Sequence, residues 1–325
     1  MPMFPSNAKL TGLVQSFVPD KRYIARTLFT PETSDSNLYE FDQIAWNRGI
    51  TTFRNENSRA GATAMTGKTR IQARLHTMRE QKLVDERLLR WENAPGQNAP
   101  EMFNQLLTRE MQDLADVFDR TEEKLCWDLL RTGTVSAVVE GVTNSYAFGI
   151  GGSATVSTPW STIATSTPIA NLKAAKDAVR QNWGAEATEV FMGSDALKYL
   201  MQSAEALAIL GEVTKDQYAV MGILEKISGL KITIVDGGYF SAGSFVPYLS
   251  DNATNVNIAI IKADGPVGQF VTTHPIDSKA PDGMYGRFAK VYEQEDPAGR
   301  FLLMTQTGLP GLTMKNKLYA LKLWT

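Results

Sequence analysis

The apolar positions of residues 101–131 are spaced three, four or seven residues apart. They are Phe103, Leu107, Met111, Leu114, Phe118, Leu125 and Leu129. Such spacing draws one apolar stripe along an α-helix. Neither Gly nor Pro interrupts the segment, Asn98 and Pro100 suit its N-terminus, and Gly133 suits its end. The pattern predicts a helix of ~31 residues, roughly 46 Å long at 1.5 Å per residue, which serves as a structural strut.

A two-residue alternation of apolar and polar positions precedes this helix. Residues 38–46 form an aromatic and β-branched run, and Ile71, Ala73, Leu75 and Thr77 alternate with polar residues. Between them lies the small and polar stretch SRAGATAMTGKT. We expect an extended β-hairpin loop over residues 37–92 with a Gly-rich tip. An isolated ribbon is marginally stable in water, so the loop is predicted to lie on another subunit. The residues expected to make that contact are Arg59, Gly61, Met65, Gly67 and Lys68.

Residues 1–36 combine short apolar runs with Pro2, Pro5, Pro19 and Pro31, and therefore predict an extended arm with at most one short helix. Helical and strand patterns alternate over residues 166–284, which predicts an α/β unit around a small sheet. Within it, Pro168 opens a helix, and a second helix has Ser194 as N-cap and Asp195 in its first turn.

Three strand-like segments, 288–294, 301–307 and 317–324, end the chain. Their apolar faces need a cover, and we expect the helix at 101–131 to provide it. The α/β unit at 166–284 is then an insertion into one split domain formed by residues 93–165 and 285–325. The predicted fold class is α+β.

Composition narrows the range of functions. The chain has 325 residues, a formal net charge of −2, one Cys and two His. An intrachain disulfide and a cysteine zinc cluster are impossible, and no strong basic field favours wrapping around nucleic acid. No stretch approaches the ~18–20 consecutive apolar residues of a membrane-spanning helix, and the start lacks a secretory signal. We expect a soluble protein made in a reducing cytoplasm.

The stretch Gly61–Thr69, GATAMTGKT, resembles a phosphate-binding loop. That loop requires four residues between its glycines, with a buried strand before and a helix after. Here five residues separate Gly61 from Gly67, the preceding segment is polar, and a strand pattern follows. A Gly-rich hairpin tip is the better interpretation, and a nucleotide-binding enzyme that uses Gly61–Thr69 is the weaker alternative.

Other candidate chemistry is also weak. The helix at 101–131 carries six carboxylates that we expect to form a solvated face with ion pairs such as Lys124–Asp128, rather than a metal site. They are Glu110, Asp113, Asp116, Asp119, Glu122 and Glu123. Cys126 is expected to be a buried, inert thiol beside the apolar stripe. We therefore expect no catalytic, cofactor-binding or metal-binding residues.

The order of parts, together with three segments, resembles a known family. The segments are FVPDKRYIARTLFT, TRIQARLHTMREQKLVDERLL and EDPAGRFLLMTQTGLPGL. They are similar in position and character to those of the lambda-type major capsid proteins (major capsid protein E family) of tailed phages, which have the HK97-like fold. The resemblance implies an N-terminal arm (1–36), an extended β-hairpin loop (37–92), a peripheral domain with a spine helix (93–165 with 285–325) and an axial domain (166–284).

The family resemblance also implies a function. Its members form pentamers and hexamers that close into an icosahedral head around double-stranded DNA, bound without sequence specificity. It implies a scaffold protein during assembly, a decoration protein, a portal protein at one vertex, assembly in the bacterial cytoplasm, and no enzymatic activity, cofactor or membrane partner. Some relatives join subunits by a Lys–Asn isopeptide bond from the extended loop, where Lys68 is suitably placed. An encapsulin-like compartment shell with an enzyme cargo is the alternative within this fold.

Overall fold

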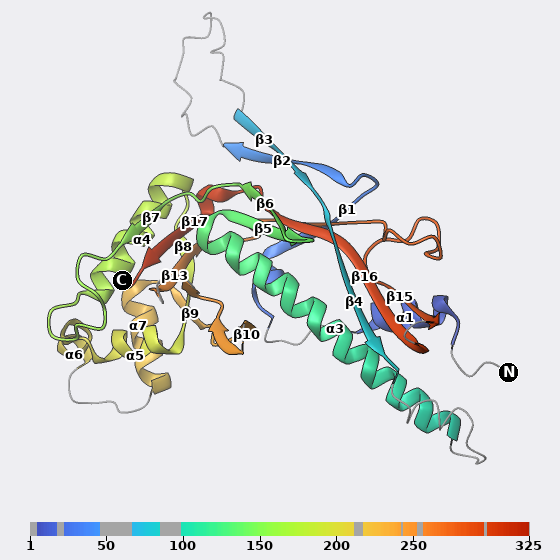
Figure 1. Cartoon of the computed structure of the whole chain (residues 1–325). Helices are drawn as coiled ribbons and strands as arrows, with labels where there is room; N and C mark the ends of the chain where they lie inside the picture. Colours follow the sequence, from blue (N-terminus) through green and yellow to red (C-terminus); the bar gives the residue numbers. More distant parts are fainter. Residues whose placement is uncertain are drawn as a thin grey trace, which may run out of the picture.

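The computed structural model describes residues 5–17, 23–45, 67–84, 99–210, 217–241, 243–251, 256–295 and 298–324. In these residues the chain forms a five-stranded sheet, a six-stranded sheet and three two-stranded ribbons. The long helix α3 (Ala99–Thr132) runs diagonally beneath the five-stranded sheet, and four further helices gather at the six-stranded sheet (Figure 1). The molecule is thus a mixed α and β protein, as the sequence predicts.

The predicted strut is confirmed as helix α3, which has 34 residues. Its apolar stripe is buried against the five-stranded sheet and the N-terminal helix α1 (Asn7–Ser16). Leu107, Met111, Leu114 and Phe118 form one core cluster with Leu302 and Met304 of the sheet. The helix therefore owes its position to the continuous burial of one side, as its periodicity requires.

The five-stranded sheet is organised around one long strand. Its strands are β1 (Phe29–Ser34), β14 (Gly268–Thr273), β16 (Ala298–Leu312), β15 (Phe288–Glu295) and β4 (His76–Leu83). Strand β16 pairs with β15 and β14 in succession along one side and with β4 on the other. Helix α1 approaches strand β15: the Thr11 hydroxyl donates to the carbonyl of Ala289 at 3.1 Å and accepts from its N–H at 3.3 Å.

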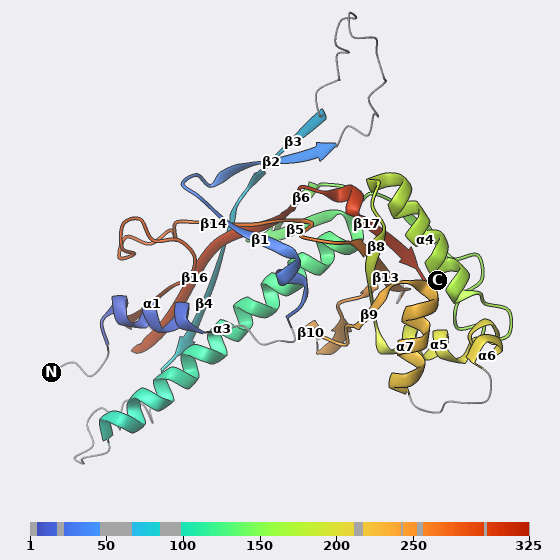
Figure 2. The same ribbon diagram turned by 180° about the vertical axis from the view of Figure 1, so that it is seen from behind.

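The six-stranded sheet forms the core of the second half. Its strands are β7 (Ser153–Thr155), β17 (Leu318–Lys322), β13 (Val256–Ala263), β8 (Ala187–Met192), β9 (Lys231–Ile234) and β12 (Ser250–Asp251). Helices α4, α5, α6 and α7 lie around it (Figure 2), and their bounds are Pro168–Trp183, Ser194–Gln202, Ala204–Leu210 and Gln217–Ser228. The predicted α/β character of this part is confirmed, although Gly193 is the N-cap of α5 and Ser194 is its first residue.

Two strands lie in a different sheet from the one the sequence pattern suggested. Strand β14 belongs to the range 166–284 but pairs with β1 and β16 in the five-stranded sheet. Strand β17 belongs to the range 285–325 but pairs with β13 and β7 in the six-stranded sheet. The boundary at residue 284 was therefore wrong for these strands. Between its described strands the chain crosses from one sheet to the other three times, after β4, after β13 and after β16.

The remaining strands form two-stranded ribbons. The ribbon β2 (Leu38–Ala45) and β3 (Gly67–Arg74) is antiparallel, belongs to neither of the two larger sheets and lies against the end of β16 (Figures 1 and 2). The others are β5 (Thr134–Val139) with β6 (Val142–Ala147), and β10 (Gly238–Ser241) with β11 (Ser244–Pro247). The predicted hairpin at 37–92 is thus confirmed for β2 and β3. Its continuation β4 is instead an integral strand of the five-stranded sheet.

Candidate functional site

The β2–β3 ribbon carries the residues that the sequence singles out for contact with another subunit. Gly67 and Lys68 open strand β3, where they pair with Ala45 and Ile44 of β2. Lys68 Nζ lies 3.7 Å from a carboxylate oxygen of Asp42 in the same ribbon. Arg59, Gly61 and Met65 lie outside the described residues. The structure thus places two of the five candidates together.

One face of the ribbon is a ladder of exposed charges. Arg70 pairs with Glu40 at 2.8 Å and with Asp42 at 3.0 Å, and Gln72 donates to Glu40 at 2.7 Å. The hydrogen bond from Arg70 lowers the pKa of Asp42. Exposed pairs of this kind contribute little to stability because solvent screens them, so they align the strands more than they stabilise the subunit.

The opposite face anchors the ribbon to the body of the protein. The ring of Phe41 lies directly over Gly311 of β16, where an added Cβ would stand 2.3 Å from the ring. Gln43 is buried and donates to the carbonyls of Phe148 at 2.8 Å and Leu312 at 3.1 Å. The inner face of the ribbon is therefore held by packing and hydrogen bonds, while its charged face is left for solvent or a partner.

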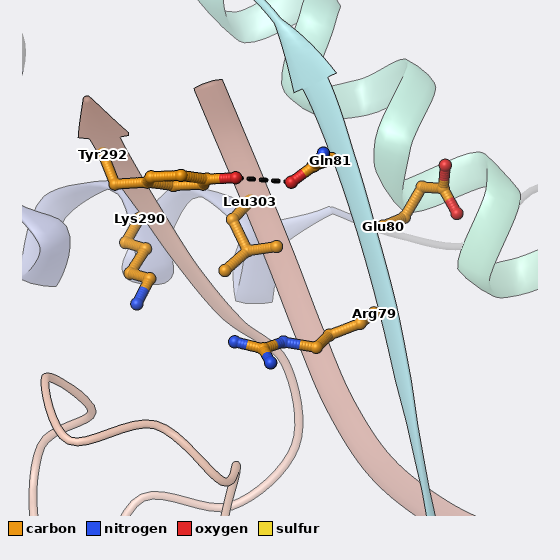
Figure 3. Close-up of a pocket in the computed structure, with 6 residues that line it drawn as sticks. All are labelled: Arg79, Glu80, Gln81, Lys290, Tyr292 and Leu303. Carbon is orange, nitrogen blue, oxygen red and sulfur yellow. Dashed lines mark hydrogen bonds between the residues drawn. The ribbon is translucent and has the colours of Figure 1, made fainter. Parts of the chain in front are cut away.

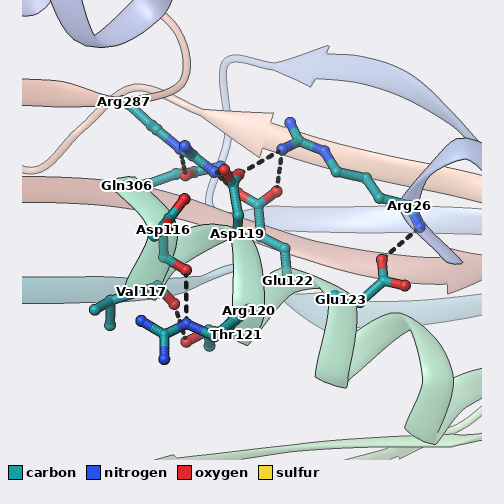
Figure 4. Close-up of polar contacts among 10 residues, drawn as sticks. All are labelled: Arg26, Asp116, Val117, Asp119, Arg120, Thr121, Glu122, Glu123, Arg287 and Gln306. Carbon is teal, nitrogen blue, oxygen red and sulfur yellow. Dashed lines mark hydrogen bonds and ion pairs between the residues drawn. The ribbon is translucent and has the colours of Figure 1, made fainter. Parts of the chain in front are cut away.

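A buried charge cluster joins α3 to two segments distant in sequence (Figure 4). It consists of Asp119, Glu122 and Glu123 of α3 with Arg26 and Arg287. The three carboxylic residues are at most 5% exposed. Arg287 donates to Asp119, to Glu122 at 3.1 Å and to Gln306 at 2.9 Å. Arg26 lies within ion-pair distance of both Asp119 and Glu122.

Glu123 attaches the short helix η1 (Ala25–Leu28) to α3. One of its carboxylate oxygens accepts from the backbone N–H of Ala25 at 2.7 Å and from Trp127 Nε1 at 2.8 Å. The other accepts from the N–H of Arg26 at 3.1 Å. Burial raises the pKa of Glu123, and these hydrogen bonds oppose that rise. The carboxylate thus satisfies backbone donors that would otherwise be buried without partners.

The prediction of a solvated acidic face on α3 was wrong for Asp119, Glu122 and Glu123. Their partners Arg26 and Arg287 lie about 100 to 170 positions away in sequence, so no local pattern points to them. The contacts follow the general rule that buried charges are paired. The predicted pair Lys124–Asp128 is confirmed at 2.6 Å. Asp113 pairs with Lys82 of β4 at 3.2 Å.

Cys126 lies beside this cluster and is fully buried. Burial raises the pKa of its thiol well above the ordinary value, and the charges of Glu123 and Glu122 raise it further. A thiol held neutral and away from solvent is a poor nucleophile. The predicted burial of Cys126 is confirmed.

A shallow hollow of about 370 Å³ lies on the face of the five-stranded sheet that carries Tyr292 and Leu303 (Figure 3). Tyr292 donates to Gln81 across its floor. Lys290 pairs with the buried Asp277, and Arg79 lies 3.9 Å from the same carboxylate. The two basic side chains at this hollow, Lys290 and Arg79, are thus both directed toward the carboxylate of Asp277. Among the described residues no group of three or more His, Cys, Asp or Glu side chains is placed to hold a metal ion.

Comparison with known families decides the identity. A family model described as phage major capsid protein E matches residues 6–323. The chain belongs to the phage major capsid protein E family. Among curated proteins, no significant match to this capsid protein is found. In the part of the chain that the structure describes, no helix is long and apolar enough to cross a membrane.

Solved structures confirm the predicted HK97-like fold of this capsid protein. A protein described as a prophage capsid protein of Escherichia coli has a TM-score of 0.64 at 14% identity, and 98% of this chain covers 99% of that one. A phage-related protein of Bordetella bronchiseptica has a TM-score of 0.60 at 12% identity, with 97% and 96% covered. The capsid protein of Myoviridae phage XM1 has a TM-score of 0.54 at 7% identity, with 95% of each covered. At sequence identities this low, the structural similarity establishes the fold alone.

Proposed function

We propose that this protein forms the head shell of a tailed phage, assembling as pentamers and hexamers into an icosahedral capsid that encloses double-stranded DNA. The observation that carries the proposal is the family match over residues 6–323, which includes the ribbon, the long helix and both sheets. A shell of many identical subunits requires several distinct contact surfaces on one chain. The elements that project from the body of this protein are suited to that requirement.

The β2–β3 ribbon supports the proposal most directly. Its inner face is anchored to the body of the protein by Phe41, Gln43 and the backbone N–H of Ile44, and its charged face is exposed. A two-stranded ribbon without a covering layer is marginal in isolation. We propose that in the shell it lies on a neighbouring subunit, with Gly67 and Lys68 near the contact and with Arg59, Gly61 and Met65 contributing from the tip.

The buried charge cluster has a supporting role in this proposal. It links the segment at Arg26, the long helix and the start of β15 by hydrogen bonds and ion pairs. Buried networks of this kind hold elements in one arrangement more than they add net stability. We propose that the cluster keeps the N-terminal segment in the orientation that assembly needs.

Other partners follow from the family and remain part of the proposal: a scaffold protein during assembly in the bacterial cytoplasm, a portal protein at one vertex and a decoration protein on the outside. The formal charge of −2 fits a shell that encloses DNA without binding it by sequence. Sedimentation velocity of the purified chain at rising concentration tests the shell proposal. We expect a fast-sedimenting species of many copies; a single-subunit boundary at every concentration would refute it.

A further inference from the structure

His274 lies where two parallel strands end side by side. Strands β1 and β14 pair in parallel as far as Ser34 and Thr273. The next residue after β1 is Asp35, in the turn that leads into the β2–β3 ribbon, and the next residue after β14 is His274, which begins the loop to β15. The parallel pairing thus brings an acid and an imidazole together just before β2.

Both ring nitrogens of His274 face hydrogen-bond acceptors. Nδ1 lies 2.7 Å from the backbone carbonyl oxygen of Met284, and Nε2 lies 3.4 Å from a carboxylate oxygen of Asp35. The ring also stacks on Tyr285, with centroids 4.3 Å apart, and the Tyr285 hydroxyl donates to the same oxygen of Asp35. The ring therefore joins the loop before β15 to the turn before β2. We call these four residues the histidine clasp.

The chemistry of imidazole makes one of the two polar contacts depend on protonation. A carbonyl oxygen only accepts, so Nδ1 carries a hydrogen in every state that keeps the contact with Met284. A neutral imidazole has one N–H, so its Nε2 presents a lone pair to the Asp35 carboxylate, whereas the imidazolium donates to both acceptors. Loss of the Nε2 proton to solvent therefore replaces an attractive contact with Asp35 by a repulsive one, while the contact with Met284 remains.

The other two ionisable members of the clasp keep their charge states near neutral pH. The hydrogen bond from Tyr285 lowers the pKa of Asp35, so the carboxylate is charged throughout the range in which histidine side chains ordinarily titrate. The same hydrogen bond raises the pKa of Tyr285, so its phenol stays neutral there. The imidazole is thus the group of the clasp whose protonation can change its contacts.

The charged side chains that flank the clasp in sequence face other partners. Asp277, three residues after His274, pairs with Lys290 of β15 and lies 3.9 Å from Arg79 of β4. Arg287, two residues after Tyr285, belongs to the buried charge cluster on α3. These groups are committed to their own ion pairs, so Asp35 is the charge that the His274 ring meets.

We propose that the histidine clasp is a pH-sensitive switch, which holds the turn before β2 to the loop before β15 when His274 is protonated and releases the turn when the ring is neutral. The turn at 35–37 leads directly into β2, so the clasp determines how firmly the start of the ribbon is held. The clasp lies within one subunit, and it can therefore be tested whether or not shells form.

The first test identifies the nitrogen that loses the proton. The chain has two histidines, so labelling histidine alone with nitrogen-15 gives two sets of ring signals in the nuclear magnetic resonance spectrum of the unassembled subunit. The variant His274→Gln assigns them. In the neutral ring of His274 we expect Nδ1 to keep its hydrogen and Nε2 to be the nitrogen that titrates, because Met284 fixes the tautomer. A neutral ring protonated at Nε2 would overturn the proposal.

The second test measures the release of the turn by hydrogen exchange of residues 34–38. After correction for the intrinsic effect of pH on exchange, protection should fall about two- to five-fold between pH ~5 and ~8, as expected for one exposed ion pair. His274→Gln and Asp35→Asn should each remove this pH dependence. His76→Gln is the matched control, because His76 follows Leu75, whose N–H donates to the carbonyl of Asn37 in the same turn at 2.7 Å.

The outcomes separate the clasp from other sources of pH dependence. Persistence of the effect in His76→Gln, together with its loss in both clasp variants, would support the switch. Protection that is constant or that rises with pH would contradict it. So would a pH dependence that survives Asp35→Asn or that disappears in His76→Gln. Circular dichroism checks that each variant is folded, which we expect because the side chain of Asp35 is 85% exposed.

Discussion

Replacing Arg287 by methionine tests whether the charge cluster on α3 is a buried and mutually dependent network. Arg287 is 10% exposed at its side chain and lies against Asp119 and Glu122, which are 6% and 0% exposed at theirs. Methionine keeps much of the side-chain volume and removes the charge. The two carboxylates would then have Arg26 as the remaining cation of the cluster, and the side chain of Arg26 is one-third exposed.

The expected magnitude follows from what is left behind. Removing one partner of a buried ion pair destabilises a protein by about 3–5 kcal/mol, because the other charge remains desolvated and unpaired. Two carboxylates lose Arg287 here, which places the expected loss at the upper part of that range. Adding Glu122→Gln to Arg287→Met should recover part of the loss, since it removes one uncompensated negative charge.

The assay is urea unfolding of the unassembled subunit, followed by far-UV circular dichroism. Arg300→Met is the matched control: Arg300 lies on the same sheet and pairs with Glu293 at 2.7 Å, but that carboxylate is 70% exposed. Its loss should be about 0–1 kcal/mol. Equal effects of the two arginine replacements, or no recovery in the double variant, would refute the interpretation of the cluster as a buried network.

Three further predictions concern α3. Leu114→Ala should destabilise the subunit by about 2–5 kcal/mol, because it opens a cavity in the core beneath the sheet, and a loss under about 0.5 kcal/mol in the same urea assay would be inconsistent with that packing. Because the pKa of Glu123 is raised from its ordinary value of 4.5, its contribution to stability is complete below that pH and is lost as pH rises through the raised value. The unfolding free energy of the unmodified protein relative to Glu123→Gln should therefore be greatest in acid and decline toward neutral pH, and a difference that grows with pH would contradict the sign. Cys126 should react with a thiol reagent only after denaturation, as absorbance at the reagent's product wavelength will report, and rapid labelling of the native protein would disprove its burial.

The elements of the fold that sequence predicts well are those governed by local periodicity. Helix α3 was expected at 101–131 and spans Ala99–Thr132, because one uninterrupted apolar stripe fixes both its existence and its buried side. The strands β2 and β3 follow the two-residue alternation around Phe41 and Ile71. In both cases the information needed lies within a few neighbouring residues.

What the sequence could not show depends on distant contacts. Strands β14 and β17 have ordinary apolar patterns, and such a pattern does not specify which of two sheets a strand joins. The acidic residues at 119, 122 and 123 resemble a solvated helix face until Arg26 and Arg287 are brought beside them. The one local indication was that these positions border Phe118, Cys126 and Trp127, all of which are buried. The exposure of Phe240 could not be predicted for a similar reason, because it is a property of the folded β10–β11 hairpin.

Electron microscopy of the purified protein in negative stain tests the central claim most directly, since shells are visible without an assay of activity. If the chain is a capsid subunit, the micrographs should show closed, uniform shells or the rings from which they are built. Class averages of those rings should have five-fold and six-fold symmetry. Single subunits at all concentrations, or open filaments without closed particles, would contradict the account.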